Sequence, residues 1–211
     1  MSKQVNYEMN TLLHRSFKRE LVRIQQGLKN AEADDRIPVG LIRRWQFFSD
    51  QLKHHHEAED TYLWPLVEER SKDQSELVVM SAMESEHAAM HRKIDALDQS
   101  FATAANGESV DIAAMLTHLG QLSGIVAGHC DHEERDAVPL LEKYVKREDL
   151  GDFMKFTRSG PDNMLVFPWV SDGATEADRK AVWGVLPGPV RLFLRPMMNK
   201  KYDRFLEETR S

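Results

Sequence analysis

Cysteine is nearly absent from this 211-residue sequence. Cys130 is the single example, so no disulfide can form within the chain, which is compatible with a reducing compartment. Long apolar runs are also lacking: none approaches the roughly 20 residues that span a bilayer, and the first residues show no basic-then-apolar signal pattern. From these absences we expect a cytoplasmic protein.

An excess of positive charge is missing as well. The chain has 28 basic and 34 acidic residues and a formal net charge of −6, so it lacks the field that draws proteins to phosphate backbones. We therefore expect no nucleic-acid partner. Residues 190–204 are basic and apolar together, which suits a lipid surface, but we expect them to pack over the rest of the protein. The sequence does not set the oligomeric state.

Strand-like alternation is absent, and four stretches instead place apolar residues at alternating steps of three and four. This spacing is typical of helices that bury one stripe. Short segments that favour turns, such as Asp34–Asp35 and the one containing Gly107, separate the stretches and imply antiparallel neighbours. The predicted fold is all-α, an up-down-up-down antiparallel four-helix bundle. The stripes are Phe17, Leu21, Ile24 and Leu28; Leu41, Trp45, Phe48 and Leu52; Met80, Met83, Met90, Ile94, Leu97 and Phe101; and Leu119, Leu122, Val126 and Leu140.

The pattern changes beyond about residue 150, where prolines and glycines interrupt any long helix. We therefore assign residues 1–150 to the bundle and residues 151–211 to an irregular, partly helical C-terminal extension. One or two short helices are expected there, near Thr175–Leu186 and Val190–Glu208.

Each of the four helices carries a histidine on its inward face, namely His14, His55, His87 and His129. Antiparallel neighbours bring residues equidistant from a turn to the same level, so these four predict one shared layer. Burying imidazoles and carboxylates without partners costs a few kcal/mol for each group. A metal centre compensates that cost, because the nitrogen and oxygen atoms become ligands of a cation.

Two of the helices repeat one another. The pairs His55-x-x-x-Glu59 and His129-x-x-x-Glu133 are each followed six residues later by Pro-Leu. Spacing of four residues puts both members of a pair on one face, about 6 Å apart, so they can share a metal or bind adjacent metals. Each proline is expected to kink its helix beyond the site.

The other histidines lie off the inward stripes or on their flanks and are expected at the surface or rim. His56 and Asp60 also stand four residues apart, but only the His55 pairing recurs in the last helix, so we prefer His55 as the ligand. Cys130 is turned about 100° from His129 on a helix and is expected not to be a ligand. The off-stripe histidines are His54, His56, His118 and His132.

Taken in order, these residues resemble the hemerythrin, or HHE cation-binding, family over roughly residues 8–148. The shared pattern is one His, then His-x-x-x-Glu, His-x-x-x-His and His-x-x-x-Glu. The resemblance implies two iron ions with a bridging oxygen species, with Glu59 and Glu133 bridging the metals, and manganese or zinc rank behind iron. His91 also fits a core histidine. The implied ligands are His14, His55, Glu59, His87, His91, His129 and Glu133.

Two features depart from the oxygen-carrying members of that family. Their last pair is His-x-x-x-x-Asp, whereas here it is His129-x-x-x-Glu133. In addition, Tyr62 lies seven residues after His55, and Asp136 lies seven residues after His129. At these positions we expect them to contact the metal ligands from outside the ligand set. Tyr62 equally fits a core aromatic residue and Asp136 a surface residue.

The resemblance implies a non-haem di-iron protein that binds or reacts with a small ligand: oxygen, nitric oxide or hydrogen peroxide. We favour peroxide breakdown or oxidation over reversible oxygen carriage. If the chain is an enzyme, it is a catalase- or peroxidase-like di-iron oxidoreductase, because no Ser/His/Asp arrangement or phosphate-binding glycine loop is present. The alternative is a regulatory protein that senses iron, oxygen or another gas and acts through its C-terminal extension.

Overall fold

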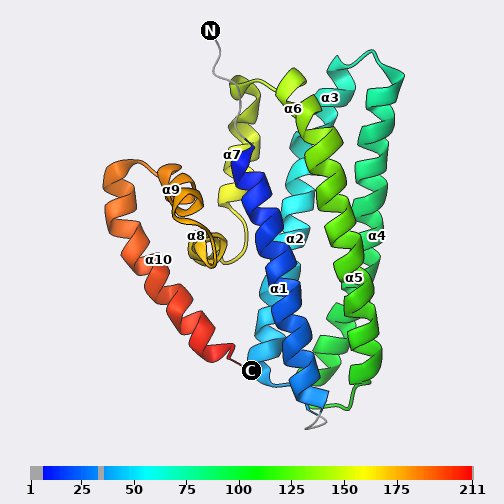
Figure 1. Cartoon of the computed structure of the whole chain (residues 1–211), viewed down its shortest axis with the longest axis vertical. Coiled ribbons are helices and arrows are strands. Elements are labelled where there is room, and N and C mark those ends of the chain that lie inside the picture. The colour runs from blue at the N-terminus through cyan, green and yellow to red at the C-terminus, as the bar shows by residue number, and fades with distance from the viewer. Residues whose placement is uncertain (1–6, 33–35, 211) are drawn as a thin grey trace.

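The computed structural model describes residues 7–32 and 36–210, and every regular element in them is helical (Figure 1). Four long helical segments run antiparallel to their chain neighbours, which confirms the predicted bundle. The turn expected at Asp34–Asp35 lies outside the described residues. The segments are α1 (Glu8–Glu32); α2 (Val39–Tyr62) with α3 (Trp64–Arg70); α4 (Gln74–Ala105); and α5 (Ile112–His132), continued by η1 (Glu133–Ala137) and α6 (Val138–Tyr144).

The C-terminal extension is more helical than expected. Two of its helices, α9 and α10, occupy the predicted places, and α10 begins two residues before the predicted start, but α7 and α8 were not anticipated. Pro168 and Pro196 lie inside helices, although the sequence around Pro168 suggested a helix break. Burial of Leu165 and Trp169 offsets the backbone hydrogen bond lost at Pro168. The elements are η2 (Arg147–Leu150), α7 (Gly151–Arg158), α8 (Asn163–Ser171), α9 (Glu176–Gly184) and α10 (Gly188–Glu208).

Two bundle segments are interrupted near their prolines, as predicted. The second segment breaks at Leu63, and Pro65 then occupies the first turn of α3, where its missing N–H costs no helical hydrogen bond. The fourth segment passes through the π-helical turn η1 before Pro139 enters the first turn of α6. Such π turns inside helices are frequent at functional sites, and this one begins at Glu133.

The apolar core is divided into two clusters. The larger one fills the bundle on the side of Met90 and also includes residues of α8 to α10, whereas the smaller one contains Met83 and the aromatic ring of Trp64. His87 lies between Met83 and Met90 on α4 and is buried. The buried polar layer predicted from the histidine positions therefore separates two hydrophobic clusters. Among the described residues, no helix is both long and apolar enough to cross a membrane.

A buried polar network fastens the extension to the bundle. The fully buried carboxylate of Glu20 accepts hydrogen bonds from Arg44 Nη1 at 2.6 Å and from Trp169 Nε1 at 3.2 Å. Arg44 Nη2 also donates to Thr209 Oγ1 at 2.8 Å. Beside it, a side chain at Gly40 would collide with a backbone carbonyl at the end of α10, so glycine permits this close approach.

Replacing Arg44 by methionine should destabilise the protein by about 3 kcal/mol, because it leaves the buried Glu20 carboxylate with only the longer ion pair to Arg23 Nη1 at 3.5 Å. The free energy of unfolding in urea measures the loss. Arg43→Met is the matched control: its partner Glu208 is exposed, so it should cost at most about 1 kcal/mol. Equal losses in the two variants would show that the buried ion pair does not hold the extension.

Candidate metal centre

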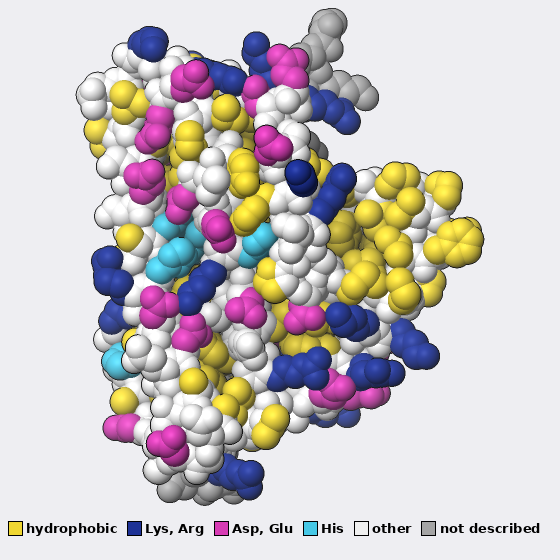
Figure 2. Space-filling view, turned by 180° about the vertical axis from the view of Figure 1, so that it is seen from behind, with side chains coloured by type: hydrophobic (Ala, Val, Ile, Leu, Met, Phe, Trp, Pro, Cys, Tyr) yellow, Lys and Arg dark blue, Asp and Glu magenta, His cyan; other side chains and the backbone are white. Residues whose placement is uncertain are grey.

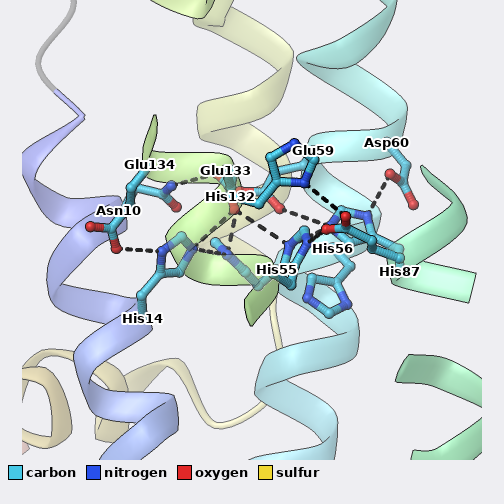
Figure 3. Close-up of polar contacts among 12 residues, drawn as sticks. Asn10, His14, His55, His56, Glu59, Asp60, His87, His132, Glu133 and Glu134 are labelled. Carbon is cyan, nitrogen blue, oxygen red and sulfur yellow. Dashed lines mark hydrogen bonds and ion pairs between the residues drawn. The ribbon is translucent and has the colours of Figure 1, made fainter. Parts of the chain in front are cut away.

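Seven histidine and glutamate side chains meet in the polar layer, and Figure 3 labels all of them except His129. They form two groups, and within each group one potential ligand atom per residue lies within 4.8 Å of all the others. All four bundle segments contribute, so the layer predicted from the depth of the histidines exists. The first group is His14, His55, Glu59 and Glu133, and the second is His56, His87 and His129.

Helix α2 supplies a histidine to each group. His55 and His56 are adjacent, so their side chains diverge by about 100° around the helix. His55 Nε2 lies 3.3 Å from His14 Nε2, while the ring of His56 stacks on His87 with centroids 4.0 Å apart. One helix therefore faces both groups with consecutive residues.

The two glutamates connect the groups. Glu59 places Oε1 at 3.3 Å from His55 Nε2 and Oε2 at 3.7 Å from His87 Nε2. Glu133 places Oε2 at 3.1 Å from His14 Nε2 and at 3.5 Å from His129 Nε2. Each carboxylate thus reaches one histidine of either group and links the two groups.

Carboxylates at the edge of the layer orient three of the rings. Since an ionised carboxylate only accepts hydrogen bonds, the paired Nδ1 atom must carry the proton. The partners are Glu134 for His14 at 2.9 Å, Asp60 for His87 at 2.7 Å, and Glu86 for His129 at 2.8 Å. Each carboxylate side chain is about one-third exposed. In metal sites this arrangement fixes the tautomer and orients the other ring nitrogen toward the metal.

The consequence is clearest for His87 and His129. Both rings carry their proton on Nδ1, so in the neutral state both Nε2 atoms present lone pairs, and these atoms lie only 3.1 Å apart. A proton would relieve the repulsion, but burial, and after it the neighbouring His87, lowers the pKa of His129. A cation that both nitrogens ligate relieves it without protonating either ring.

The pKa shifts of the buried side chains show which of them can carry charge when no cation is present. Burial alone would lower the pKa of His14, but the charge of Glu133 and hydrogen bonds from its neighbours raise it well above the usual value. Burial, followed by the charge of Glu133, raises the pKa of Glu59 well above its usual value. Burial also holds the pKa values of His55 and His56 well below the usual range. Despite its burial, Glu133 has a pKa lowered to about 2 by the charge of His14, so without a cation the charge of the layer is confined largely to the ion pair of His14 and Glu133.

A metal ion would also bind buried carboxylate oxygens that the protein leaves without a hydrogen bond. Glu59 Oε2 is buried and has no hydrogen-bond partner among the described residues, although a buried polar atom without a partner costs about 1–3 kcal/mol. Glu133 Oε2 is also buried, and its contact with His14 Nε2 at 3.1 Å is an ion pair rather than a well-aligned hydrogen bond. Five imidazoles and two carboxylates form a mixed nitrogen and oxygen set, which suits iron, manganese or zinc. The layer is therefore capable of holding metal.

Six of the seven ligands expected from the sequence lie in these groups, and His91 does not. Its Nε2 lies 3.3 Å from Nδ1 of His56, so it contacts the ligand set from outside. His56, expected at the surface or rim, is instead 1% exposed and takes the seventh place. The sequence did contain a hint of this role, because His56 directly follows His55. The recurring His-x-x-x-Glu motif nevertheless favoured His55 alone as the ligand from this helix.

The two supporting residues expected from the sequence lie at the edge. Tyr62 is half-buried, and its ring packs against Phe156 with centroids 5.3 Å apart. Asp136 accepts from Arg135 and lies 3.3 Å from His132 Nε2. Both lie outside the two ligand groups.

Sequence reasoning missed the residues that orient the ligands. Besides the three edge carboxylates, Asn10 Nδ2 donates to Glu133 Oε1 at 2.7 Å, and His132 shares Glu86 with His129. In the sequence, Glu86 and Glu134 are ordinary charges on a helix flank. Only the packed bundle shows which histidine each one meets. Cys130 is buried, as its position beside His129 allows, and it lies outside both groups.

A four-helix bundle with histidines and glutamates at one buried level defines a helical cation-binding protein. The model of the hemerythrin HHE cation-binding domain family matches residues 7–141, and the chain belongs to that family. The chain is also similar to the zinc finger protein BRUTUS of Arabidopsis thaliana, with 26% identity over 148 residues. That match covers 68% of this chain and 11% of BRUTUS. No solved structure matches.

The two candidate histidines can be separated by mutation. His56→Ala should lower the metal content from about two ions per chain to about one, because it removes a ligand. His91→Ala should retain both ions while weakening affinity by about 10–100-fold, as loss of a supporting partner does. Elemental analysis and competition with a chelator measure these effects, and His118→Ala, on the same helix as His129 but outside both groups, is the control. The reverse result would restore His91 as the ligand.

Proposed function

We propose that the chain is a non-haem di-iron protein whose seven ligands are His14, His55, His56, Glu59, His87, His129 and Glu133, and that it reacts with a small ligand, preferably hydrogen peroxide. The observation that carries the proposal is the pair of Nε2 lone pairs on His87 and His129, which face one another at 3.1 Å in a buried layer. Iron, rather than manganese or zinc, rests on family membership.

The two groups differ in their number of imidazoles. The second group provides three and the first only two, while both glutamates reach both groups. The metal beside His14 and His55 therefore has fewer protein ligands, and we place the binding of the small ligand there. Phe17 packs on His55 with centroids 5.4 Å apart, so one wall of this position is apolar and excludes water.

When bound, the iron pair supplies electron transfer to and from the small ligand. The protein must then move protons, because peroxide breakdown to water and oxygen both releases and consumes them. His14 Nδ1 donates to Glu134, whose side chain is 31% exposed. Glu134 can therefore accept the Nδ1 proton of His14, exchange it with water, and return a proton to the same nitrogen. This connection favours peroxide turnover over simple carriage.

Oxygen evolution from peroxide tests the reaction. The iron-loaded protein should evolve oxygen at an oxygen electrode, and His129→Ala should reduce the rate to that of free iron in the same buffer, because it removes a ligand. His118→Ala, on the same helix and outside both groups, should keep the full rate. A stable, reversible oxygen adduct without peroxide turnover would instead identify the protein as a carrier.

A second candidate function is sensing of iron or gas through the extension. The ring of His54, next to the ligands His55 and His56, stacks on Phe156 of α7 with centroids 4.4 Å apart. Gly160 abuts the same ring so closely that a side chain there would collide with it. A shift of α2 at the metal ligands would therefore press directly on the extension.

Limited proteolysis separates the two functions. If the protein is a sensor, metal loading should change the cleavage rate after residue 150 severalfold, and Phe156→Ala should reduce that change because it removes the contact with His54. Phe193→Ala is the control, since Phe193 is 77% exposed and lies in α10. Identical cleavage with and without metal would exclude the sensor.

A further inference from the structure

Exposed hydrophobic side chains gather at one corner of the extension. Of the eight large hydrophobic residues that are exposed in the described part of the chain, five lie between residues 185 and 197. We call them the apolar tip. They surround the turn from α9 into α10, and Figure 2 shows hydrophobic side chains covering a part that projects from the bundle. The tip consists of Val185, Val190, Leu192, Phe193 and Met197.

Most of the apolar tip lies on the exposed first half of α10, whereas the second half packs against the rest of the protein. Met198, Tyr202 and Phe205, in the second half of the helix, are buried against the rest of the protein. Leu192 and Phe193, in the first half, are 72% and 77% exposed. The sequence-based expectation that this segment packs over the bundle therefore holds only for its second half. Something outside the described chain is needed to cover the first half.

The segment that contains the apolar tip carries positive charge only. Residues 179–202 contain six lysines and arginines and no acidic residue. Since the whole chain has a formal charge of −6 and this segment has +6, the remainder carries −12. The segment that bears the apolar tip is therefore basic within an acidic chain, although Asp178 and Asp203 flank it and Lys201 pairs with Asp162. A surface that is both acidic and apolar would complement it.

A second copy of the chain does not provide that surface. Symmetric pairing of two tips would bring two segments of charge +6 together. Pairing of the tip with another face needs an apolar counterpart, but the other exposed large hydrophobics are single residues on separate helices: Val22 on α1, Val39 on α2 and Val78 on α4. A lipid surface needs no matching groove, because a projecting apolar side chain can enter the headgroup region while lysine and arginine remain at the phosphates.

We propose that the apolar tip docks the protein on a membrane surface rich in anionic lipids. Leu192 and Phe193 enter the interface, and nearby basic residues such as Arg195 and Lys200 contact the acidic headgroups. The attachment is peripheral and leaves the bundle in water. It is independent of the reaction proposed at the metal layer.

Flotation with lipid vesicles tests the docking. The full chain should bind phosphatidylcholine vesicles containing roughly a third phosphatidylglycerol, and bind pure phosphatidylcholine at least about tenfold more weakly. The double substitution Leu192→Ser and Phe193→Ser should lower binding at least about tenfold without changing the melting temperature, because both side chains are exposed. Val22→Ser with Val78→Ser, which removes two exposed hydrophobics elsewhere, should bind like the unaltered chain.

Charge is tested separately. Replacing Arg195 and Lys200 by glutamine should weaken binding to the anionic vesicles about fivefold for each residue, and added salt should act in the same direction. Absence of vesicle binding, or full binding by the Leu192/Phe193 variant, would overturn the proposal. A third contrary outcome is a concentration-dependent dimer in sedimentation that the Leu192/Phe193 variant abolishes, together with no binding to vesicles. The tip would then join copies of the chain.

Discussion

The protein's interior depends on the direction in which three imidazole rings carry their protons. His14, His87 and His129 each donate Nδ1–H to a carboxylate at the edge of the polar layer, so their Nε2 atoms all point inward. The Nε2 lone pairs of His87 and His129 face one another, and His14 Nε2 faces Glu133. Apolar clusters lie on both sides of that layer, which excludes the water that would otherwise hydrate the lone pairs. A cation is the counter-charge that permits the layer to be dry.

The bundle and most of the layer were predictable from periodicity. Buried stripes predict long helices, short turns predict antiparallel order, and equal distances from the turns place His14, His55, His87 and His129 at one depth. These inferences succeed because they use only backbone geometry, which repeats regularly along a helix. The resemblance to a known family then added the carboxylates as bridges, and Glu59 and Glu133 do contact both groups.

The choice between neighbouring side chains was not predictable in the same way. His56 and His91 both lie near the inward face of their helices, and a rotation of α2 or α4 by a fraction of a turn exchanges their roles. That rotation is set by packing across the whole bundle, including the break at Leu63 and the π turn that begins at Glu133. The short helices α7 and α8 were missed because internal or nearby prolines and glycines obscured them. In α8, tertiary burial supplied the stability that local propensity lacks.

The C-terminal extension is fixed to the bundle at two places and exposed at a third. Arg44 holds Thr209 at the end of α10, and His54 stacks on Phe156 in α7, so both ends of the extension rest on α2, the helix that supplies ligands to both groups. Between these ends, α8 and the second half of α10 are buried, and the chain turns outward at the apolar tip. A purely structural cap would cover its own hydrophobic residues, as the second half of α10 does. Exposure of Leu192 and Phe193 within a basic segment therefore indicates that the corner is shaped by contact with something else.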